Sequence, residues 1–367
     1  MRHIHSTAVA VAAGCAVALI AAAPAQAGGH GPSVPSTVAS GLNNPRGLAF
    51  SSDGTLFVAE AGKGGAGPCQ PGPEGGTVCF GTSSSITKVR HGHQYRIVTN
   101  LPSLASPAGE EAIGASDVSL GRDGLLFTVG LGGNPALRTQ VPQLAGMAKL
   151  YRLSGKGPRA VADLGGYEQR VNPDGVTPPD TNPQALLATR GGTFAVDAGG
   201  NSLLRVDHGR ISTVATFPQR TVPAPPGIPD LPPTLPLQAV PTSVVAGPDG
   251  ALYVGELTGF PFPPGLARIW RIRPGHAPTV YASGFTNVID IAFGPDGKLY
   301  VLEISKNGLL DPSTAGALIK IGRNGSTTEL PVSLTAPGGL AIRGNSAYVS
   351  NCSVCPGTGT VLRIPLG

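Results

Sequence analysis

Apolar residues in this chain gather in short runs, and the runs come in pairs separated by Asp-Gly or a related turn sequence. Asp53-Gly54 and Asp296-Gly297 are two of these turns. Two apolar or alternating runs joined by such a turn predict a β-hairpin. The paired runs are 45–50 with 56–60, 116–120 with 126–129, 183–187 with 194–197, 242–245 with 252–256, 289–293 with 299–303, and 338–342 with 347–351. The sequence therefore predicts one hairpin repeated along the chain.

Further apolar runs extend each hairpin. After a loop of variable length, a third run covers residues 85–89, 148–153, 202–206, 268–272, 317–321 and 360–364. In all units but the last, a Gly- or His-containing turn leads to a fourth run, as at Tyr95–Thr99 and Thr279–Ala282. Four strands in a period of about 40–50 residues are typical of a β-propeller blade. We therefore expect an all-β, six-bladed β-propeller, because the alternative β-sandwich would not repeat one hairpin in this way.

The last unit lacks a fourth strand, because the chain ends at Gly367. Ser36–Leu42 is similar in sequence to Pro278–Phe285, which contains the predicted fourth strand Thr279–Ala282. We expect this N-terminal segment to supply the outer strand of the last blade. That pairing closes the ring and covers an otherwise exposed strand edge.

Composition agrees with a turn-rich β fold. The 367 residues include 54 Gly and 37 Pro, 41% are apolar and only 13% are charged. The apolar content excludes a disordered chain, the lack of a three-residue glycine period excludes collagen, and so much Gly and Pro argues against a helical protein. The chain has 26 basic and 21 acidic residues, and the basic residues form no continuous run. We therefore expect no nucleic-acid partner.

The first 27 residues are typical of a secretory signal peptide. An apolar stretch, Ala8–Ala23, is followed by the small-residue cleavage pattern Ala25-Gln26-Ala27. A membrane anchor is less favoured because the stretch is shorter than about 20 residues. A lipoprotein that begins at Cys15 is less favoured because it would keep half of the stretch. We expect residues 28–367 to form a single secreted, extracellular propeller domain that is a monomer without a membrane span.

The repeat predicts which residues share one face of the ring. First strands begin and second strands end on the same face, which we call the mouth. The first ring of residues around it contains Gly47, Asp117, Gln184, Ser243, Asp290 and Gly339. The second ring contains Glu60, Gly130, Asp197, Glu256, Glu303 and Asn351.

Carboxylates that converge at the mouth repel one another unless something compensates. One solution is a divalent cation, calcium rather than zinc, because hard cations take several oxygen ligands. The candidate ligands are Asp117, Asp290, Glu256, Glu303, Asp197 and Glu60. Raised pKa values are a second solution, and a third is that second-strand carboxylates accept backbone N–H groups of their own loops. Asp117 and Asp290 are the stronger cation candidates, because first strands begin nearest the axis.

Catalytic motifs are missing from the mouth, whereas long loops are predicted there. The turns on the opposite face contain His91, His93, His208 and His276. No nucleophile-elbow, zinc-protease or phosphate-loop pattern occurs, which weakens a Ser-His-Asp triad or a His-ligated metal. Loops on one face are common places for binding sites. The predicted mouth-side insertions span 61–84, 131–147, 218–241 and 257–266.

Four cysteines follow the signal peptide, namely Cys69, Cys79, Cys352 and Cys355. An even number in a secreted chain favours disulfides. Local pairing, Cys69 with Cys79 and Cys352 with Cys355, is favoured, whereas crossed pairing would connect the first and last blades directly. A Cys₄ zinc site is a further alternative, less favoured in an oxidising compartment, and a redox Cys-x-x-Cys lacks its usual βαβ context.

Several of these segments resemble the ScyD/ScyE family of secreted propellers, which are related to NHL-repeat proteins. The most specific segment is Glu256–Gly265, and the others are Pro45–Gly62, Asp197–Val206, Val240–Ser243 and Gly284–Gly297. The similarity spans essentially the whole chain after the signal peptide. It implies a secreted six-bladed propeller without one defined activity. Gluconolactonase-like and strictosidine-synthase-like enzymes are more distantly similar, but this sequence has no confirmed copy of their ligand pattern.

Two functions agree with these observations. One is a binding module that recognises a small molecule, a glycan or an extracellular protein at the mouth. The other is a divalent-cation-dependent enzyme, either a lactonase-like hydrolase or an oxidative biosynthetic enzyme. In that enzyme Asp117, Asp290 or Glu256 would be a metal ligand or a base. The missing motifs favour the binding module, and the carboxylates favour the enzyme.

Overall fold

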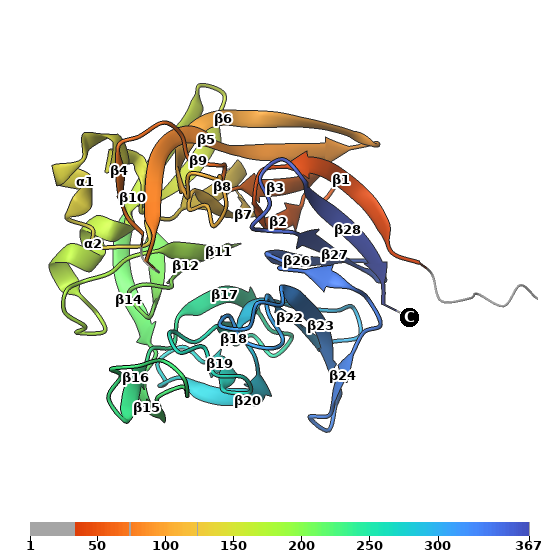
Figure 1. Cartoon of the computed structure of the whole chain (residues 1–367). Helices are drawn as coiled ribbons and strands as arrows, with labels where there is room; N and C mark the ends of the chain where they lie inside the picture. The colour runs from red at the N-terminus through yellow and green to blue at the C-terminus, as the bar shows by residue number, and fades with distance from the viewer. Residues whose placement is uncertain (1–33, 73–74, 123, 367) are drawn as a thin grey trace, which may run out of the picture. The chain divides into compact units, whose positions relative to one another are not determined.

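Each predicted hairpin gains two further strands and becomes one blade. The computed structural model describes residues 34–72, 75–122 and 124–366, so the predicted signal peptide, 1–27, lies outside it. The described residues contain six antiparallel sheets built on the predicted repeats, which confirms the six-bladed β-propeller. Figure 1 shows the sheets around a central axis.

The strands of the blades follow one another along the chain. Blade 1 contains β2 (Pro45–Phe50), β3 (Leu56–Glu60), β5 (Thr77–Arg90) and β6 (His93–Ala105). Blade 2 contains β7 (Ala115–Gly121), β8 (Gly124–Val129), β9 (Lys149–Ser154) and β10 (Gly157–Asp163). Blade 3 contains β11 (Pro183–Thr189), β12 (Gly192–Asp197), β13 (Ser202–Asp207) and β14 (Arg210–Thr216). Blade 4 contains β17 (Pro241–Ala246), β18 (Leu252–Glu256), β19 (Ala267–Ile272) and β20 (Thr279–Phe285). Blade 5 contains β21 (Val288–Phe293), β22 (Leu299–Glu303), β23 (Ala315–Ile321) and β24 (Thr327–Glu329).

Blade 6 joins the two ends of the described chain. It contains β26 (Gly339–Arg343), β27 (Ser346–Asn351), β28 (Gly359–Pro365) and β1 (Ser36–Leu42). Strand β1 pairs antiparallel with β28, with Ser36 opposite Arg363 and Leu42 opposite Gly359, and Figure 1 shows the two strands side by side. The N-terminal outer strand therefore closes the ring, as the sequence predicts.

The junction between blades 6 and 1 has its own hydrogen bonds. Gln94 on β6 accepts a hydrogen bond from Ser40 N at 3.0 Å and donates one to Ser40 O at 2.7 Å. Arg96 on the same strand donates to Gly41 O at 3.3 Å. Side chains of blade 1 thus satisfy backbone groups on the outer strand of blade 6.

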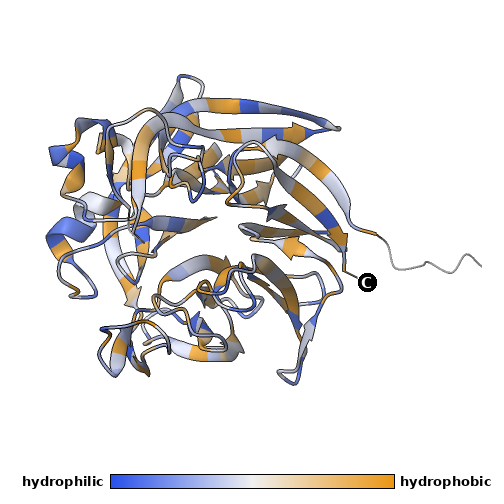
Figure 2. Ribbon diagram, viewed as in Figure 1, coloured by the Kyte–Doolittle hydropathy of each residue, from blue (hydrophilic) through white to orange (hydrophobic). Residues whose placement is uncertain are grey.

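The core lies between adjacent blades. Val196 and Leu203 of blade 3, for example, belong to one buried cluster with Val254 and Trp270 of blade 4. Figure 2 shows apolar residues along strands of every sheet. Because each blade buries one face against each neighbour, its strands need apolar residues on both faces.

Additional elements lie in the mouth-side connections. Short strand β4 (Cys69–Pro71) extends blade 1, and α1 (Leu137–Gln140) with the 3₁₀ helix η1 (Pro142–Gly146) follows β8. Helix α2 (Leu164–Val171) connects blades 2 and 3, and β25 (Leu334–Thr335) pairs with β23. The proline-rich segment forms a hairpin of β15 (Arg220–Pro223) and β16 (Thr234–Leu237).

The disulfides confirm the local pairing. Cys69 is bonded to Cys79, and Cys352 is bonded to Cys355. The first bond joins β4 to β5, and the second closes the loop between β27 and β28. Among the described residues, no helix is long and apolar enough to cross a membrane.

Deletion of residues 34–41 tests the ring closure. The deletion removes most of β1, which buries Ala39 and pairs with β28. We expect the whole domain to lose about 3 kcal/mol or more, comparable to the loss of a large buried side chain. The unfolding temperature in differential scanning calorimetry measures this. Ser40→Ala is the control, since Gln94 contacts the backbone N and O of this exposed residue. An unchanged melting curve for the deletion would contradict the proposed role of β1.

Candidate functional site

A small polar cavity lies at the axis of the propeller. Its volume is about 10 Å³, which is close to the space of one water molecule. The first strands of blades 1 to 5 contribute residues to its lining, and the first strand of blade 6 begins directly after Gly338. Its lining consists of Gly47, Ser116, Asp117, Gln184, Ala185, Thr242, Ile289, Asp290 and Gly338.

A bulge near the mouth end of the first strand adds a residue to the lining. In blade 2 the register shifts between Ala115 and Asp117, and in blade 3 it shifts between Pro183 and Ala185. The bulge leaves one residue without a cross-strand partner, so consecutive residues of one strand both reach the axis. Gly47, Asp117, Gln184 and Asp290 line the cavity as expected, whereas Thr242 and Gly338 take the places predicted for Ser243 and Gly339.

Asp117 and Asp290 link first strands of neighbouring blades. Asp117 accepts hydrogen bonds from Val118 N at 2.8 Å and from Leu186 N of blade 3 at 2.9 Å. Asp290 makes the same pair of contacts, with Ile291 N at 2.7 Å and Leu340 N of blade 6 at 2.6 Å. Gly47 leaves the room for Asp117, since a Cβ at this position would overlap its carboxyl group. Both carboxylates therefore have a structural role in addition to lining the cavity.

Burial at the axis disfavours the charged form of both groups. It raises the pKa of Asp290 to about 7, although two backbone N–H groups act in the opposite direction. The pKa of Asp117 is raised well above its usual range, first by burial and then by the negative charge of Asp290. A proton or a cation in the cavity would relieve this cost.

The second ring repeats one contact in four blades. The side chain at the end of the second strand accepts a hydrogen bond from the backbone N–H of the segment that leads into the first strand. The pairs are Glu60 with Asn43 N at 2.7 Å, Asp197 with Asn182 N at 2.6 Å, Glu303 with Thr286 N at 2.7 Å, and Asn351 with Thr335 N at 2.8 Å. These side chains thus accept backbone N–H groups of the segment that enters their blade, and Asp197 also accepts one from its own following loop, at Gly200. Burial also raises the pKa of Asp197 to about 6 and that of Glu303 to about 7.

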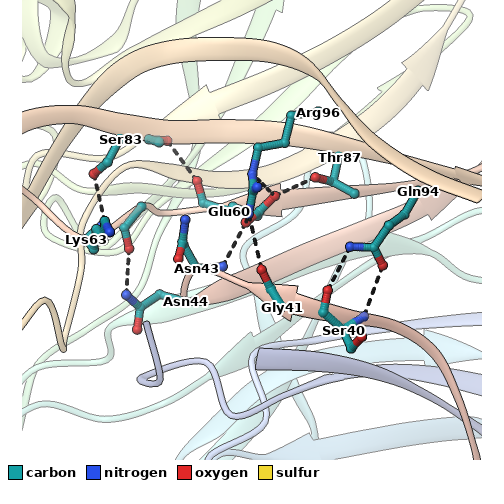
Figure 3. Close-up of polar contacts among 12 residues, drawn as sticks. Ser40, Gly41, Asn43, Asn44, Glu60, Lys63, Ser83, Thr87, Gln94 and Arg96 are labelled. Atoms are coloured by element: carbon teal, nitrogen blue, oxygen red, sulfur yellow. Dashed lines mark hydrogen bonds and ion pairs between the residues drawn. The ribbon is translucent and has the colours of Figure 1, made fainter. Parts of the chain in front are cut away.

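Glu60 is the most heavily hydrogen-bonded member of the second ring, and Figure 3 shows its surroundings. Arg96 binds it with two parallel contacts, Nε to Oε1 at 3.0 Å and Nη2 to Oε2 at 2.7 Å. Thr87 donates a further hydrogen bond to Oε1. Glu60 is fully buried, so Arg96 from the outer strand supplies the charge that offsets its burial.

Glu256 has different partners from the other members. It accepts a hydrogen bond from Trp270 Nε1 at 2.7 Å and forms an ion pair with Arg220 of the β15–β16 hairpin. Arg220 also donates to Leu266 O at 3.0 Å. Burial nevertheless raises the pKa of Glu256, while Arg220 acts against this shift. The carboxylate therefore fastens the proline-rich hairpin to blade 4.

The candidate metal ligands do not gather into one group. Within residues 34–366, apart from the few positions outside the description, no three His, Cys, Asp or Glu side chains lie together in a way that could hold a metal ion. Only Asp117 and Asp290 share the axial cavity, and Gly130 brings no side chain to its position in the second ring. A calcium ion at the mouth stays a prediction. Of the four histidines expected on the opposite face, His91, His208 and His276 lie in turns between third and fourth strands, and His93 begins β6.

Sequence reasoning missed the apolar side chains on the mouth side. In the described chain, exposed large apolar residues of the mouth-side connections are Val171, Ile228, Phe260, Leu266 and Leu310. The remaining ones lie before β1 or on outer strands and are Val34, Tyr95, Val280 and Tyr281. The loop insertions were the signal that could have located them.

Stability should fall as the pH rises from 5 to 8 in the presence of a chelator. The folded-state pKa of Asp290, about 7, lies above its usual value of 3.8, so between these values the folded protein binds more protons than the unfolded protein. Each such group contributes a slope of up to about 1.4 kcal/mol per pH unit. Urea unfolding at several pH values measures the slope. Asp290→Asn should flatten it, and stability that increases towards pH 8 would contradict the assignment.

Arg96→Met should destabilise the protein by about 3–5 kcal/mol, because it leaves the buried charge of Glu60 without its partner. Adding Glu60→Gln should recover part of this loss, since the amide carries no charge. Urea unfolding of the two single variants and the double variant gives the coupling energy. Strictly additive costs would show that the ion pair does not support the fold.

The fold is shared with several solved structures. No protein-family model matches the sequence, and no curated protein is significantly similar to it. A streptogramin B lyase is 12% identical with a TM-score of 0.51, over 91% of this chain and 98% of the lyase. A glucose dehydrogenase is 13% identical with a TM-score of 0.51, over 91% of this chain and 100% of its own. A virginiamycin B lyase from Staphylococcus aureus is 14% identical with a TM-score of 0.47, over 89% and 96%. The likeness to the first two, at 12% and 13% identity, shows the β-propeller fold alone, and a shared fold does not imply a shared function.

Proposed function

We propose that this protein is a secreted β-propeller of the ScyD/ScyE type that binds an extracellular ligand on the rim of its mouth. Two disulfides and the predicted signal peptide support secretion. The observation that carries the proposal is the group of exposed apolar side chains in the mouth-side connections. Exposed apolar patches commonly mark interaction sites.

The rim patch consists of Phe260, Leu266 and Leu310, which come from the second-to-third strand loops of blades 4 and 5. These loops lie against each other, because a Cβ at Gly308 would lie 3.1 Å from Phe262 O and 3.3 Å from Pro264. The loops that carry these three residues therefore lie side by side on adjacent blades.

Hydrogen bonds hold the blade 4 loop in place. Asn287 donates to Leu257 O at 3.0 Å, and Gly265 N donates to Thr286 at 3.0 Å. On its other side, Gly259 N donates to Gln238 O at 2.9 Å. A loop fixed in this way loses little conformational entropy on binding.

The axial cavity is too small for an organic ligand. Its volume of about 10 Å³ is far below the roughly 300–1,000 Å³ of usual small-molecule pockets. A glycan or protein that lies across the rim therefore suits the geometry better than a small molecule enclosed at the axis.

A cation-dependent enzyme is the second candidate. Asp290 and Asp117 face one polar cavity, and burial raises the pKa of Asp290 to about 7, a value suited to proton transfer near neutral pH. In a lactonase-like reaction, a carboxylate there would take a proton from water. Each carboxylate already accepts two backbone hydrogen bonds, so this role competes with their structural one.

Phe260→Ser and Leu310→Ser should weaken ligand binding at least about tenfold without unfolding the protein, because each removes exposed apolar area from the interface. Immobilised protein is first screened against soluble polysaccharides, extracellular proteins and sugar lactones. Each ligand found is then titrated against the variants by surface plasmon resonance.

Val280→Ser is the matched control, because Val280 is similarly exposed but lies on outer strand β20. A ligand that binds the rim variants and wild type equally would exclude the rim patch. Turnover of a lactone that is lost in Asp290→Asn and kept in Phe260→Ser would instead support the enzyme.

A further inference from the structure

Four carboxylates lie together outside the axial cavity, where the connection between blades 2 and 3 meets blade 3. Glu168 is on helix α2, Asp174 and Asp180 follow this helix, and Asp197 ends β12. We call this group the blade 3 acidic site. The negative charges that act on Glu168 are those of Asp197, Asp174 and Asp180.

Glu168 is buried without a partner. Its side chain is 0% exposed, and among the described residues neither carboxylate oxygen has a hydrogen-bond partner. A buried carboxylate usually has its oxygens satisfied, and leaving a charged one unpaired costs several kcal/mol. The site therefore lacks a group that would satisfy these oxygens.

Two further side-chain oxygens in this region also lack a hydrogen-bond partner among the described residues. Asp180 Oδ1 and Asn172 Oδ1 are buried and, within the described chain, have no hydrogen-bond partner. Asn172 directly follows α2, one turn after Glu168, and its left-handed backbone (φ 44°) ends the helix. The backbone of Asn172 also caps the helix by donating to Glu168 O at 2.8 Å. A helix C-terminus carries partial negative charge, which favours a cation.

Glycines bring the loop after β12 against these oxygens. A Cβ at Gly200 would lie 2.5 Å from Glu168 Oε2 and 3.5 Å from Asp180 O, and a Cβ at Gly199 would lie 2.8 Å from Asp180 Oδ1. Both carboxylates therefore lie on the same Gly199-Gly200 dipeptide, although α2 and this loop are far apart in sequence. Side chains at these positions would fill the space.

The other two carboxylates are already satisfied. Asp174 accepts hydrogen bonds from Val176 N and Asn201 Nδ2, both at 2.9 Å. Asp197 accepts from Thr181, Asn182 and Gly200. They supply negative charge to the site, while Glu168, Asp180 and Asn172 have oxygens left over.

We propose that the blade 3 acidic site binds a calcium ion through Glu168, Asp180 and Asn172 Oδ1. Calcium accepts six to eight oxygen ligands in flexible geometry and mixes carboxylates with amide and backbone carbonyls. Such a mixed set needs only two free carboxylates, which agrees with the lack of a group of three. The ion would tie α2 to the Asp180 segment that leads into β11 and so fix the connection between blades 2 and 3.

The test is calcium binding by the full protein after treatment with a chelator and dialysis. We expect one calcium ion to bind in isothermal titration calorimetry and to raise the unfolding temperature. Glu168→Gln should weaken this binding at least about tenfold, as loss of a metal-site group does. In calcium-free buffer at pH 9 the same variant should unfold at a higher temperature than wild type, because burial and the neighbouring carboxylates raise the pKa of Glu168 to about 8 and its unpaired charge is present only above that value.

Two comparisons make the result specific. Glu110→Gln, an exposed carboxylate in another mouth-side connection, should keep wild-type calcium binding. The proposal is overturned if wild type shows neither heat of binding nor a thermal shift with calcium. It is equally overturned if Asp290→Asn abolishes binding while Glu168→Gln does not, because the ion would then lie at the axis.

Discussion

The fold depends on satisfying backbone N–H groups where the chain enters each innermost strand. At this point the chain leaves an outer strand, crosses the mouth and turns down beside the axis, where strand pairing does not satisfy all of its backbone N–H groups. In four blades a side chain from the end of the second strand accepts the N–H, and Glu60, Asp197 and Glu303 are carboxylates that do so. Asp117 and Asp290 do the same between neighbouring blades. Most carboxylates at the mouth therefore have a structural role in the ring.

This use of carboxylates separates the two regions of the mouth. At the axis Asp117 and Asp290 accept hydrogen bonds from backbone N–H groups and line a cavity of about 10 Å³. At the rim, Phe260, Leu266 and Leu310 are exposed on loops held by neighbouring segments. A rigid polar centre with an apolar rim is better suited to holding a partner than to enclosing one.

The sequence predicts features that depend on local patterns. The repeated hairpins, the ring closure by Ser36–Leu42 and the local disulfides were all found, because turn residues and cysteine spacing encode them. The bulges were not predicted, since a shift of one residue leaves the apolar pattern unchanged, and Thr242 therefore took the place of Ser243 at the axis.

Contacts between distant segments were also beyond prediction. Arg96 and Arg220 neutralise Glu60 and Glu256 from an outer strand and a proline-rich hairpin, which no spacing rule connects. Glu168 was not predicted as a site residue because α2 lies in a connection outside the repeat.

The pairing of β1 with β28 can form only late in synthesis. It is the first element of the described chain to leave the ribosome, yet its partner β28 is the last. Until then β1 remains an unpaired edge, the kind that invites aggregation. The sequence of β1 limits aggregation while the strand is unpaired, because Ser36, Thr37, Ser40 and Gly41 leave little apolar surface exposed. Blade 6 can therefore form only after both β1 and β28 have been synthesised, so it is the last blade to be completed.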